Sequence, residues 1–346
     1  MNFIIRPLKE NDLSEADRIF RLAFGTFLGL PDPMTCFGDA DYVRTRFYSD
    51  PHSAYGAIIA DDVDPDSGNG KLVGSNFTTN WGSVGFFGPL TIHPDYWGKG
   101  VARSLMEPTI QLFSKWKTKH AGLFTFAHSP KHISLYQKFG FWPYFLTAIM
   151  SKDVRPARDK YNKDSSKLNW SKYSEVFKGE KEEEKYLLNA CRRLTTAIYD
   201  GLDLSVEIMS VMKQRLGDIV LVWDVDNKSD SNNKKLAAFG ICHCGKETEA
   251  GSNKCYVKFA AVQPPSTHDD APLAANTFER LLNASEAFAS ERGLSRLVAG
   301  VNTCRQRAYE KMLSYGFHYD MLGIAMQKGN DVGYNRPDVY IMDDWR

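Results

Sequence analysis

The sequence lacks a long apolar run, and its charges balance. Its 346 residues include 43 lysines and arginines against 42 aspartates and glutamates, so the net charge favours neither nucleic acid nor an anionic membrane as a partner. No apolar run approaches the roughly 20 residues that a membrane-spanning helix needs. The first residues also lack the basic stretch and apolar core that mark a secretory signal. We therefore expect a cytoplasmic protein that binds no nucleic acid and no membrane.

Cysteine is scarce as well. Six cysteines in a chain of 346 residues do not make a disulfide framework, and we expect reduced thiols. Cys242, His243, Cys244 and Cys255 come closest to a metal site, because residues two apart share one face of a strand. Their spacing is not a recognised zinc pattern, however, and free cysteines are often buried as small apolar groups. We expect no metal.

The most informative segment that is present is a glycine-rich turn between an apolar strand and a helix. The apolar stretch Phe86–Ile92 runs into a turn at His93, and Gly98 and Gly100 follow. Apolar residues then recur at helical spacing over 98–116. Glycine has no Cβ, and the first N–H groups of a helix have no partner within it, so such a turn can hold a phosphate closely. Glycine pairs are common, so this turn alone is a weak signal.

The segments that follow the turn make the signal specific. Leu123–Ala127 is an apolar strand, and 128–139 has the pattern of a turn and a short helix. Gly140 then opens a further strand that reaches Met150. The predicted order is strand, glycine turn, helix, strand, helix, Gly-Phe and strand.

In this order the residues resemble the GNAT (Gcn5-related) N-acetyltransferases. Gly98–Ala102 is similar to that family's pyrophosphate loop. Residues 134–141 are similar to its second signature, in which a tyrosine, here Tyr136, stands four residues before Gly-Phe. The opening 5–12 and the amphipathic stretch 16–24 look like the family's first strand and helix. The resemblance therefore extends from the first residues to the strand that ends at Met150.

The resemblance implies an enzyme that transfers an acetyl or other acyl group from acetyl-CoA to a primary amine by direct attack. The residues that match the family's CoA site are Ile92, Trp97, Gly98, Lys99, Gly100, Val101, Ala102, Arg103 and Ser129. Trp97 replaces the usual Gln or Arg, and Ser129 replaces an asparagine that contacts the pantetheine arm. Lys99 and Arg103 either meet the CoA phosphates or belong to a solvated helix face.

The chemistry of acyl transfer suggests roles for individual groups. Negative charge develops on the carbonyl oxygen and then on the departing sulfur, and a backbone N–H near Ile92 can stabilise the first. Tyr136 is the candidate general acid for the sulfur, with a core aromatic as the alternative. His93 and His128 each end a predicted strand and titrate in the useful range, so they are candidate bases.

The proton acceptor stays open at this stage. Asp39 and Asp41 are weaker candidates for it, because they lie in the stretch that usually borders the acceptor. A relay through water is a further alternative.

The C-terminal half has the pattern of a second, altered copy. Gly316-Phe317 repeats Gly140-Phe141, and each glycine is followed ten residues later by a methionine, Met326 or Met150. The second copy has Gln263–Asp270 in place of a glycine loop, and its prolines and acidic pair disfavour phosphate. Met312 stands where the first copy has its tyrosine. We expect this copy to be non-catalytic.

Together these observations predict an α/β (α+β) protein of two tandem GNAT-like domains, each a mixed, mainly antiparallel sheet flanked by helices. Residues 1–152 form the predicted catalytic domain, 153–180 a polar linker, and 181–346 the degenerate domain. A small-molecule amine is the favoured acceptor of the acyl group. The sequence leaves open whether the protein forms a homodimer. The alternatives are a protein or peptide N-acetyltransferase, and a CoA-binding sensor or scaffold without turnover.

Overall fold

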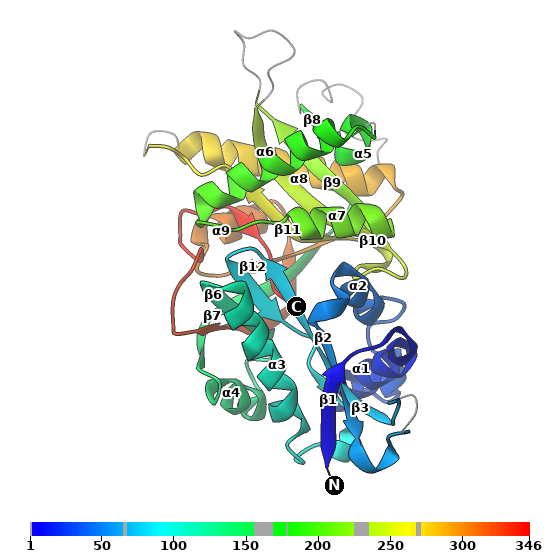
Figure 1. Ribbon diagram of the computed structural model, residues 1–346. Helices are drawn as coiled ribbons and strands as arrows, with labels where there is room; N and C mark the ends of the chain where they lie inside the picture. The colour runs from blue at the N-terminus through cyan, green and yellow to red at the C-terminus, as the bar shows by residue number, and fades with distance from the viewer. Residues whose placement is uncertain (1, 65–67, 156–168, 178, 225–234, 268–270) are drawn as a thin grey trace.

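A computed structural model describes residues 2–64, 68–155, 169–177, 179–224, 235–267 and 271–346 (Figure 1). We call 2–155 the first half and 169–346 the second half. The described strands are β1 Phe3–Pro7, β2 Ala54–Ile59, β3 Leu72–Trp81, β4 Val84–Phe87, β5 Thr91–Ile92, β6 His120–Thr125, β7 Phe141–Asp153, β8 Trp170–Lys172, β9 Gly217–Trp223, β10 Leu236–Gly245, β11 Gly251–Val262, β12 Arg296–Asn302, β13 His318–Lys328 and β14 Ile341–Met342.

The described α-helices are α1 Leu13–Phe27, α2 Tyr42–Ser49, α3 Val101–Trp116, α4 Pro130–Gln137, α5 Tyr173–Val176, α6 Lys181–Ile198, α7 Ser205–Gln214, α8 Ala271–Glu291 and α9 Gln306–Ser314. None of them is both long and apolar enough to cross a membrane. Half of the predicted linker, residues 156–168 and 178, lies outside the described residues, as do Asp269 and Asp270.

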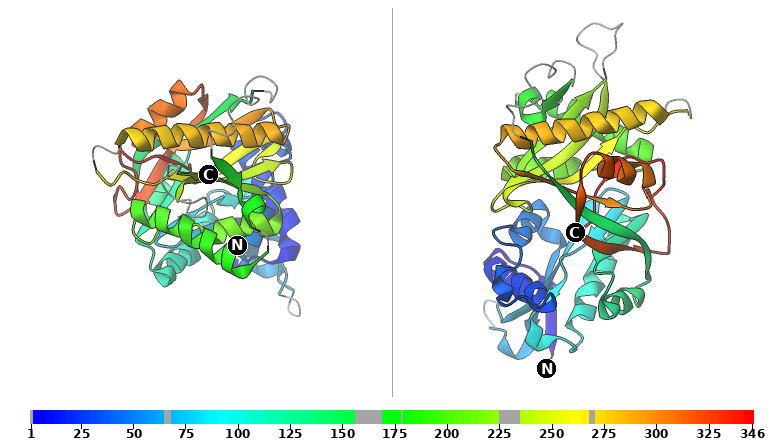
Figure 2. Two further views of the ribbon diagram at one scale, coloured as in Figure 1. Left: turned by 90° about the horizontal axis from the view of Figure 1, so that it is seen from above. Right: turned by 180° about the vertical axis from the view of Figure 1, so that it is seen from behind.

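In the second half, helices cover both faces of the sheet. Seen from above, α6 and α8 lie on opposite sides of the strands (Figure 2). The strand β9 is an uninterrupted apolar run from Ile219 to Trp223, and every residue in that run is buried. Such a run is typical of strands that are covered on both sides. Phe278, Leu281 and Phe288 of α8 repeat at helical spacing and are fully buried against it.

The two halves share a single mixed sheet. Its main path runs β1-β2-β3-β4-β6-β13-β7-β12-β11-β10-β9-β8. The strand β13, from the second half, lies between β6 and β7, which are neighbours in the chain, and it is antiparallel to both. In turn β7, from the first half, pairs with β12 over Thr147–Asp153. Each half is thus completed by a strand of the other, and the predicted domain boundaries remain predictions.

The parallel pairing of β4 and β6 stops early. It extends from Val84 and His120 to Phe87 and Leu123. Beyond that point the chain after β4 continues as β5, which pairs with β3 on its other side. The first half therefore has an opening between β5 and the end of β6.

In the second half two parallel strands also diverge, but a further strand fills the space between them. The parallel pairing of β11 and β12 ends at Val257 and Ala299, and β14 then pairs with β11 at Ala260 and Ala261. Buried Arg305 holds β14 in place by donating to the carbonyl of Ile341 at 3.1 Å and to Asp343 at 2.5 Å.

Buried charges join the halves beside this opening. Glu249 accepts from Arg46 of α2 at 3.1 Å and from Lys258 of β11 at 2.9 Å. Lys258 also pairs with Glu207 of α7 at 2.8 Å. Burial acts to raise the pKa of Glu249, but the two cations outweigh it and hold that pKa well below its usual range.

We expect Glu249→Gln to lower the free energy of unfolding by about 3–5 kcal/mol at pH 7, because buried Arg46 loses its carboxylate partner and Lys258 keeps only Glu207. A depressed carboxyl pKa stabilises the fold above the ordinary value of 4.5, and this contribution is lost as the pH falls. The difference between wild type and variant should therefore shrink from pH 7 to pH 4. Denaturant unfolding at both pH values measures it, with exposed Glu247→Gln as control. An equal difference at the two pH values would contradict the assignment.

Candidate active site

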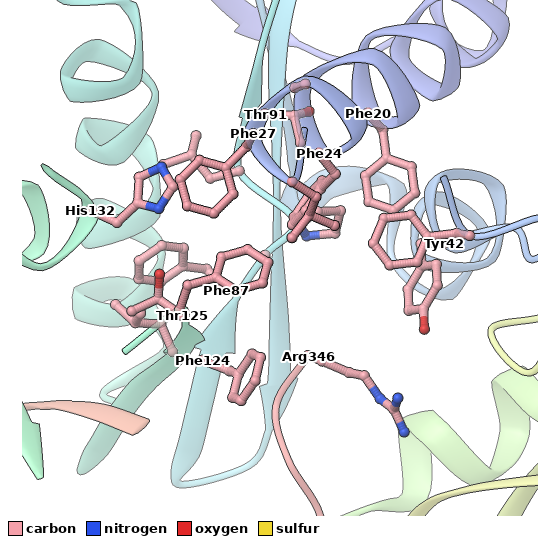
Figure 3. A pocket seen from close by; sticks show the side chains of 18 of the residues that line it. Phe20, Phe24, Phe27, Tyr42, Phe87, Thr91, Phe124, Thr125, His132 and Arg346 are labelled. Atoms are coloured by element: carbon pink, nitrogen blue, oxygen red, sulfur yellow. The ribbon is translucent and has the colours of Figure 1, made fainter. Parts of the chain in front are cut away.

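A cavity of about 1270 Å³ lies where β5 and β6 part. Its wall in the first half comes from α1, the start of α3, α4 and the segments beside β5. The second half contributes side chains of β11, β12 and β13, and the end of the chain adds Trp345 and Arg346. Figure 3 shows aromatic rings on several sides of this space, with His132 at one end and Arg346 at the other.

The predicted phosphate turn lines the cavity. Gly98 and Gly100 have φ of +76° and +85°, and nothing lies within 4 Å of where a Cβ would stand. Gly100 precedes the first turn of α3, where the amides of Val101, Ala102 and Arg103 have no partner within the helix. These amides and the positive end of the helix make a site for an anion.

The backbone of Ile92 faces the open side of β5. The neighbouring amide of His93 donates to Val73 of β3 at 2.8 Å. Because backbone groups alternate along an antiparallel strand, the N–H and C=O of Ile92 point away from β3 and toward the opening. Ile92 lines the cavity, as its predicted role near the thioester requires.

The other residues of the predicted loop differ in whether they line the cavity. The indole of Trp97 donates to the carbonyl of Ile92 at 2.8 Å, so this departure from the family pattern has a structural partner. Trp97 and Arg103 line the cavity, whereas Lys99 does not. The ammonium of Lys99 lies 4.9 Å from the centre of the Tyr96 ring.

Tyr136 lines the cavity from α4. Its ring packs edge-on against Phe87, with centroids 5.6 Å apart. Burial raises the pKa of its phenol, so the group holds its proton at neutral pH. A protonated phenol at this wall is what a general acid for a departing thiolate requires.

The two predicted histidines and Ser129 lie outside the cavity wall. His93 begins a short 3₁₀ turn and accepts from the amide of Asp95 at 3.3 Å. His128 stacks on Phe27 with ring centres 5.8 Å apart. Ser129 accepts from the amide of the first turn of α4 at 3.5 Å and so acts as its cap. The predicted roles of all three in the reaction stay predictions.

The structure adds a histidine that sequence reasoning missed. His132 precedes Tyr136 by one turn of α4, and both side chains line the cavity. Its ring lies 4.9 Å from that of Phe27. Partial burial, with Lys131 and His128 nearby, lowers the pKa of His132, which keeps the imidazole neutral at pH 7. The sequence signal that could have identified His132 was its position four residues before Tyr136.

Each carboxylate that lines the cavity already has partners. Asp39 accepts from the amide of Ser252 at 2.8 Å and from its hydroxyl. Glu249 holds its two cations, and Asp320 accepts from Arg296 at 3.0 Å. Among the described residues of the wall, His132 is therefore the neutral base that carries no ion pair. Asp41, the other aspartate considered as a proton acceptor, caps α2 instead by accepting from the amide of Arg44.

The residues considered for a metal do not converge. Cys244 and Cys255 face each other across β10 and β11 with sulfurs 3.7 Å apart. His243 lies on the opposite face, 3.9 Å from Glu207. In the described part of the chain, no three histidines, cysteines or acids gather where they could hold a metal ion.

Residues 26–141 match the family model described as the acetyltransferase (GNAT) family. The chain therefore contains a GNAT acetyltransferase domain, as its motifs predict. The match confirms the predicted class of enzyme, an acyltransferase of a family that takes its acyl group from acetyl-CoA. No curated protein matches the chain.

Solved structures share the fold at low identity. A putative acetyltransferase from Pyrococcus horikoshii is 13% identical, with a TM-score of 0.61 over 98% of this chain and 93% of that one. A GCN5-related N-acetyltransferase from Sphaerobacter thermophilus is 13% identical, with a TM-score of 0.52 over 94% and 95%. The GCN5-related glucosamine N-acetyltransferase region of a fungal multi-domain GH3 β-N-acetylglucosaminidase is 13% identical, with a TM-score of 0.59 over 94% and 38%. These likenesses confirm the predicted fold class.

We expect Gly100→Ala to weaken CoA binding at least tenfold, because a Cβ at this turn strains the backbone and enters the anion site. Isothermal titration with CoA measures the affinity, and the wild type should bind one molecule per chain. The matched control is Gly293→Ala, which has a similar φ of +68° and equally open surroundings and does not line the cavity. Similar affinities for the two variants would refute the assignment of the turn.

Proposed function

We propose that the protein transfers an acetyl group from acetyl-CoA to the primary amine of a small molecule. The observation that carries the proposal is the cavity itself, which both halves wall in beside the glycine turn. A volume of about 1270 Å³ suits one arm of CoA and a small acceptor. A long, open groove would instead favour a protein or peptide acceptor.

In the proposed reaction, the amides that follow Gly98 and Gly100 hold the pyrophosphate of CoA. The amine nitrogen attacks the thioester carbon, and the Ile92 amide stabilises the charge on the carbonyl oxygen. The carbon–sulfur bond then breaks, and Tyr136 donates its proton to the thiolate. His132 accepts the proton that the amine nitrogen loses. Water returns that proton to Tyr136, so the net transfer is from amine to sulfur.

We propose His132 rather than His93 or His128 as the base because it lines the cavity beside Tyr136. The surrounding wall is largely aromatic and aliphatic, and two of its carboxylates, Glu249 and Asp320, are ion-paired with protein cations. The lysines and arginines of the wall outnumber its carboxylates, so loss of the ammonium proton is favoured before attack.

We further propose that the chain has two GNAT-like copies and one CoA site. Two observations support a silent second copy. The segment with β14 occupies the parting between β11 and β12, and Met312, at the position of Tyr136, is fully buried. A thioether cannot donate a proton to a thiolate, so this position offers no general acid.

Tyr136→Phe should lower kcat by about 10²–10⁴-fold with little change in the KM for acetyl-CoA, because the ring packing stays and only the proton donor is lost. Release of CoA from acetyl-CoA, followed across a panel of small amines and N-terminal peptides, provides the measurement. Tyr55→Phe, outside the cavity, is the control. Turnover with peptides alone would favour the protein acceptor. Binding of acetyl-CoA without turnover of any acceptor would favour the sensor.

His132→Gln should reduce kcat/KM by about 10²-fold and alter the pH profile. A base is competent only when neutral, so wild-type activity should fall as the pH drops through a pKa below 6.5. The variant should lack this acid limb. His128→Gln, which also removes an imidazole next to Phe27 but outside the cavity wall, should keep it. An unchanged limb in His132→Gln would point to another base.

A further inference from the structure

Aromatic side chains from α1 and the segment after it form one wall of the cavity (Figure 3). Phe24 and Phe27 come from α1, Phe37 from the following loop, and Tyr42 from the start of α2. We call these four side chains the aromatic wall. Phe37 is central to it, because its ring packs within 5.5 Å of both Phe24 and Tyr42. Phe20 of α1, which is almost fully buried and also lines the cavity, stacks on Phe37 with ring centres 4.7 Å apart.

The backbone of Phe37 is strained. Its φ is +65°, in the left-handed region that bulky side chains rarely adopt. Phe37 is nevertheless 38% exposed as a residue, so packing within the protein accounts for only part of its position. Strained residues of this kind persist where the surrounding structure enforces them, and they concentrate at ligand sites.

Arg21 enforces the strained loop. Its guanidinium donates to three carbonyls of the loop, those of Cys36 at 3.0 Å, Gly38 at 2.5 Å and Ala40 at 2.7 Å. Asp17 holds the same guanidinium from one turn earlier on α1, at 2.7 Å. The loop therefore cannot relax without breaking several charge-assisted hydrogen bonds. The ring of Phe37 is fixed toward the cavity before any ligand arrives.

The charges of the cavity limit what this wall can bind. Its carboxylates, Asp39, Glu249 and Asp320, are already engaged by protein donors. Asp39 is held only by neutral groups of Ser252, but lysines and arginines outnumber the carboxylates on the wall, so a second ammonium group on a ligand would face mainly positive charge. Polyamines and aminoglycosides are disfavoured for this reason, whereas an aryl or branched alkyl group can pack on the rings.

We propose that the aromatic wall binds the body of the acceptor, and that this acceptor is a primary amine with one aryl or bulky alkyl group and no second charge. The inference rests on the proposed acetyltransferase function. It separates a recognition element, the wall, from the reacting groups on α4. The same apolar chemistry could also receive a long acyl chain of the donor, and the experiments below distinguish these two sources.

The first experiment compares acceptors with acetyl-CoA as the fixed donor. The kcat/KM for 2-phenylethylamine should exceed those for 1,4-diaminobutane and for an aminoglycoside at least tenfold. Equal values across the panel would overturn the assignment of the wall and leave the acetyltransferase function intact. Binding of acetyl-CoA with no turnover of any amine would overturn the proposed function itself.

The second experiment removes the central ring. Phe37→Gly should raise the KM for 2-phenylethylamine about tenfold and leave the KM for acetyl-CoA unchanged, because glycine adopts the left-handed conformation freely. Met34→Ala is the control, since Met34 is equally exposed nearby and does not line the cavity. Thermal unfolding checks the fold, and Phe24→Leu replaces the variant if Phe37→Gly does not fold. If the variant instead loses only its rate with long-chain acyl-CoAs, the wall serves the donor and the proposal is wrong.

Discussion

The architecture of the site depends on one interruption of hydrogen bonding. The parallel strands β4 and β6 are paired only as far as Phe87 and Leu123, and past this point their backbones diverge. The unpaired side of β5 and the free amides at the start of α3 then border the same space. Unsatisfied backbone groups inside a protein require a partner. In the first half the indole of Trp97 serves the carbonyl of Ile92, and the start of α3 stays open to the cavity. In the second half the chain supplies the partner itself through β14.

Local signals in the sequence were enough to predict the strands and helices around the glycine turn and part of the site. The apolar run of β9, the helical spacing of α8 and the glycines before α3 each appear within one short window of sequence. Tyr136 could be found by its distance from Gly140. Its environment could not, because the ring of Phe87 belongs to a distant strand. His132 was missed for the same reason, since contact with Phe27 of α1 became visible only in three dimensions.

The order of the strands was beyond local patterns. Nothing in the sequence of β13 indicates that it lies between β6 and β7, because pairing between distant segments leaves no short-range periodicity. The same holds for β14, whose position depends on Arg305 and on the shape of the parting that it fills. Several residues from outside the matched family segment also border the cavity, among them Glu249, Tyr256 and Arg296. The segment that matches the family model therefore supplies only part of the cavity wall.

The exchange of strands has a consequence for how the chain is made. When β6 and β7 leave the ribosome, the strand that separates them in the finished sheet lies more than 160 residues downstream. Until β13 is synthesised, β6 has an unpaired edge, and unpaired edges promote association between chains. Contacts this distant in sequence also slow folding. A fragment that ended after β7 would keep those edges permanently, although it would contain the whole segment that matches the family model.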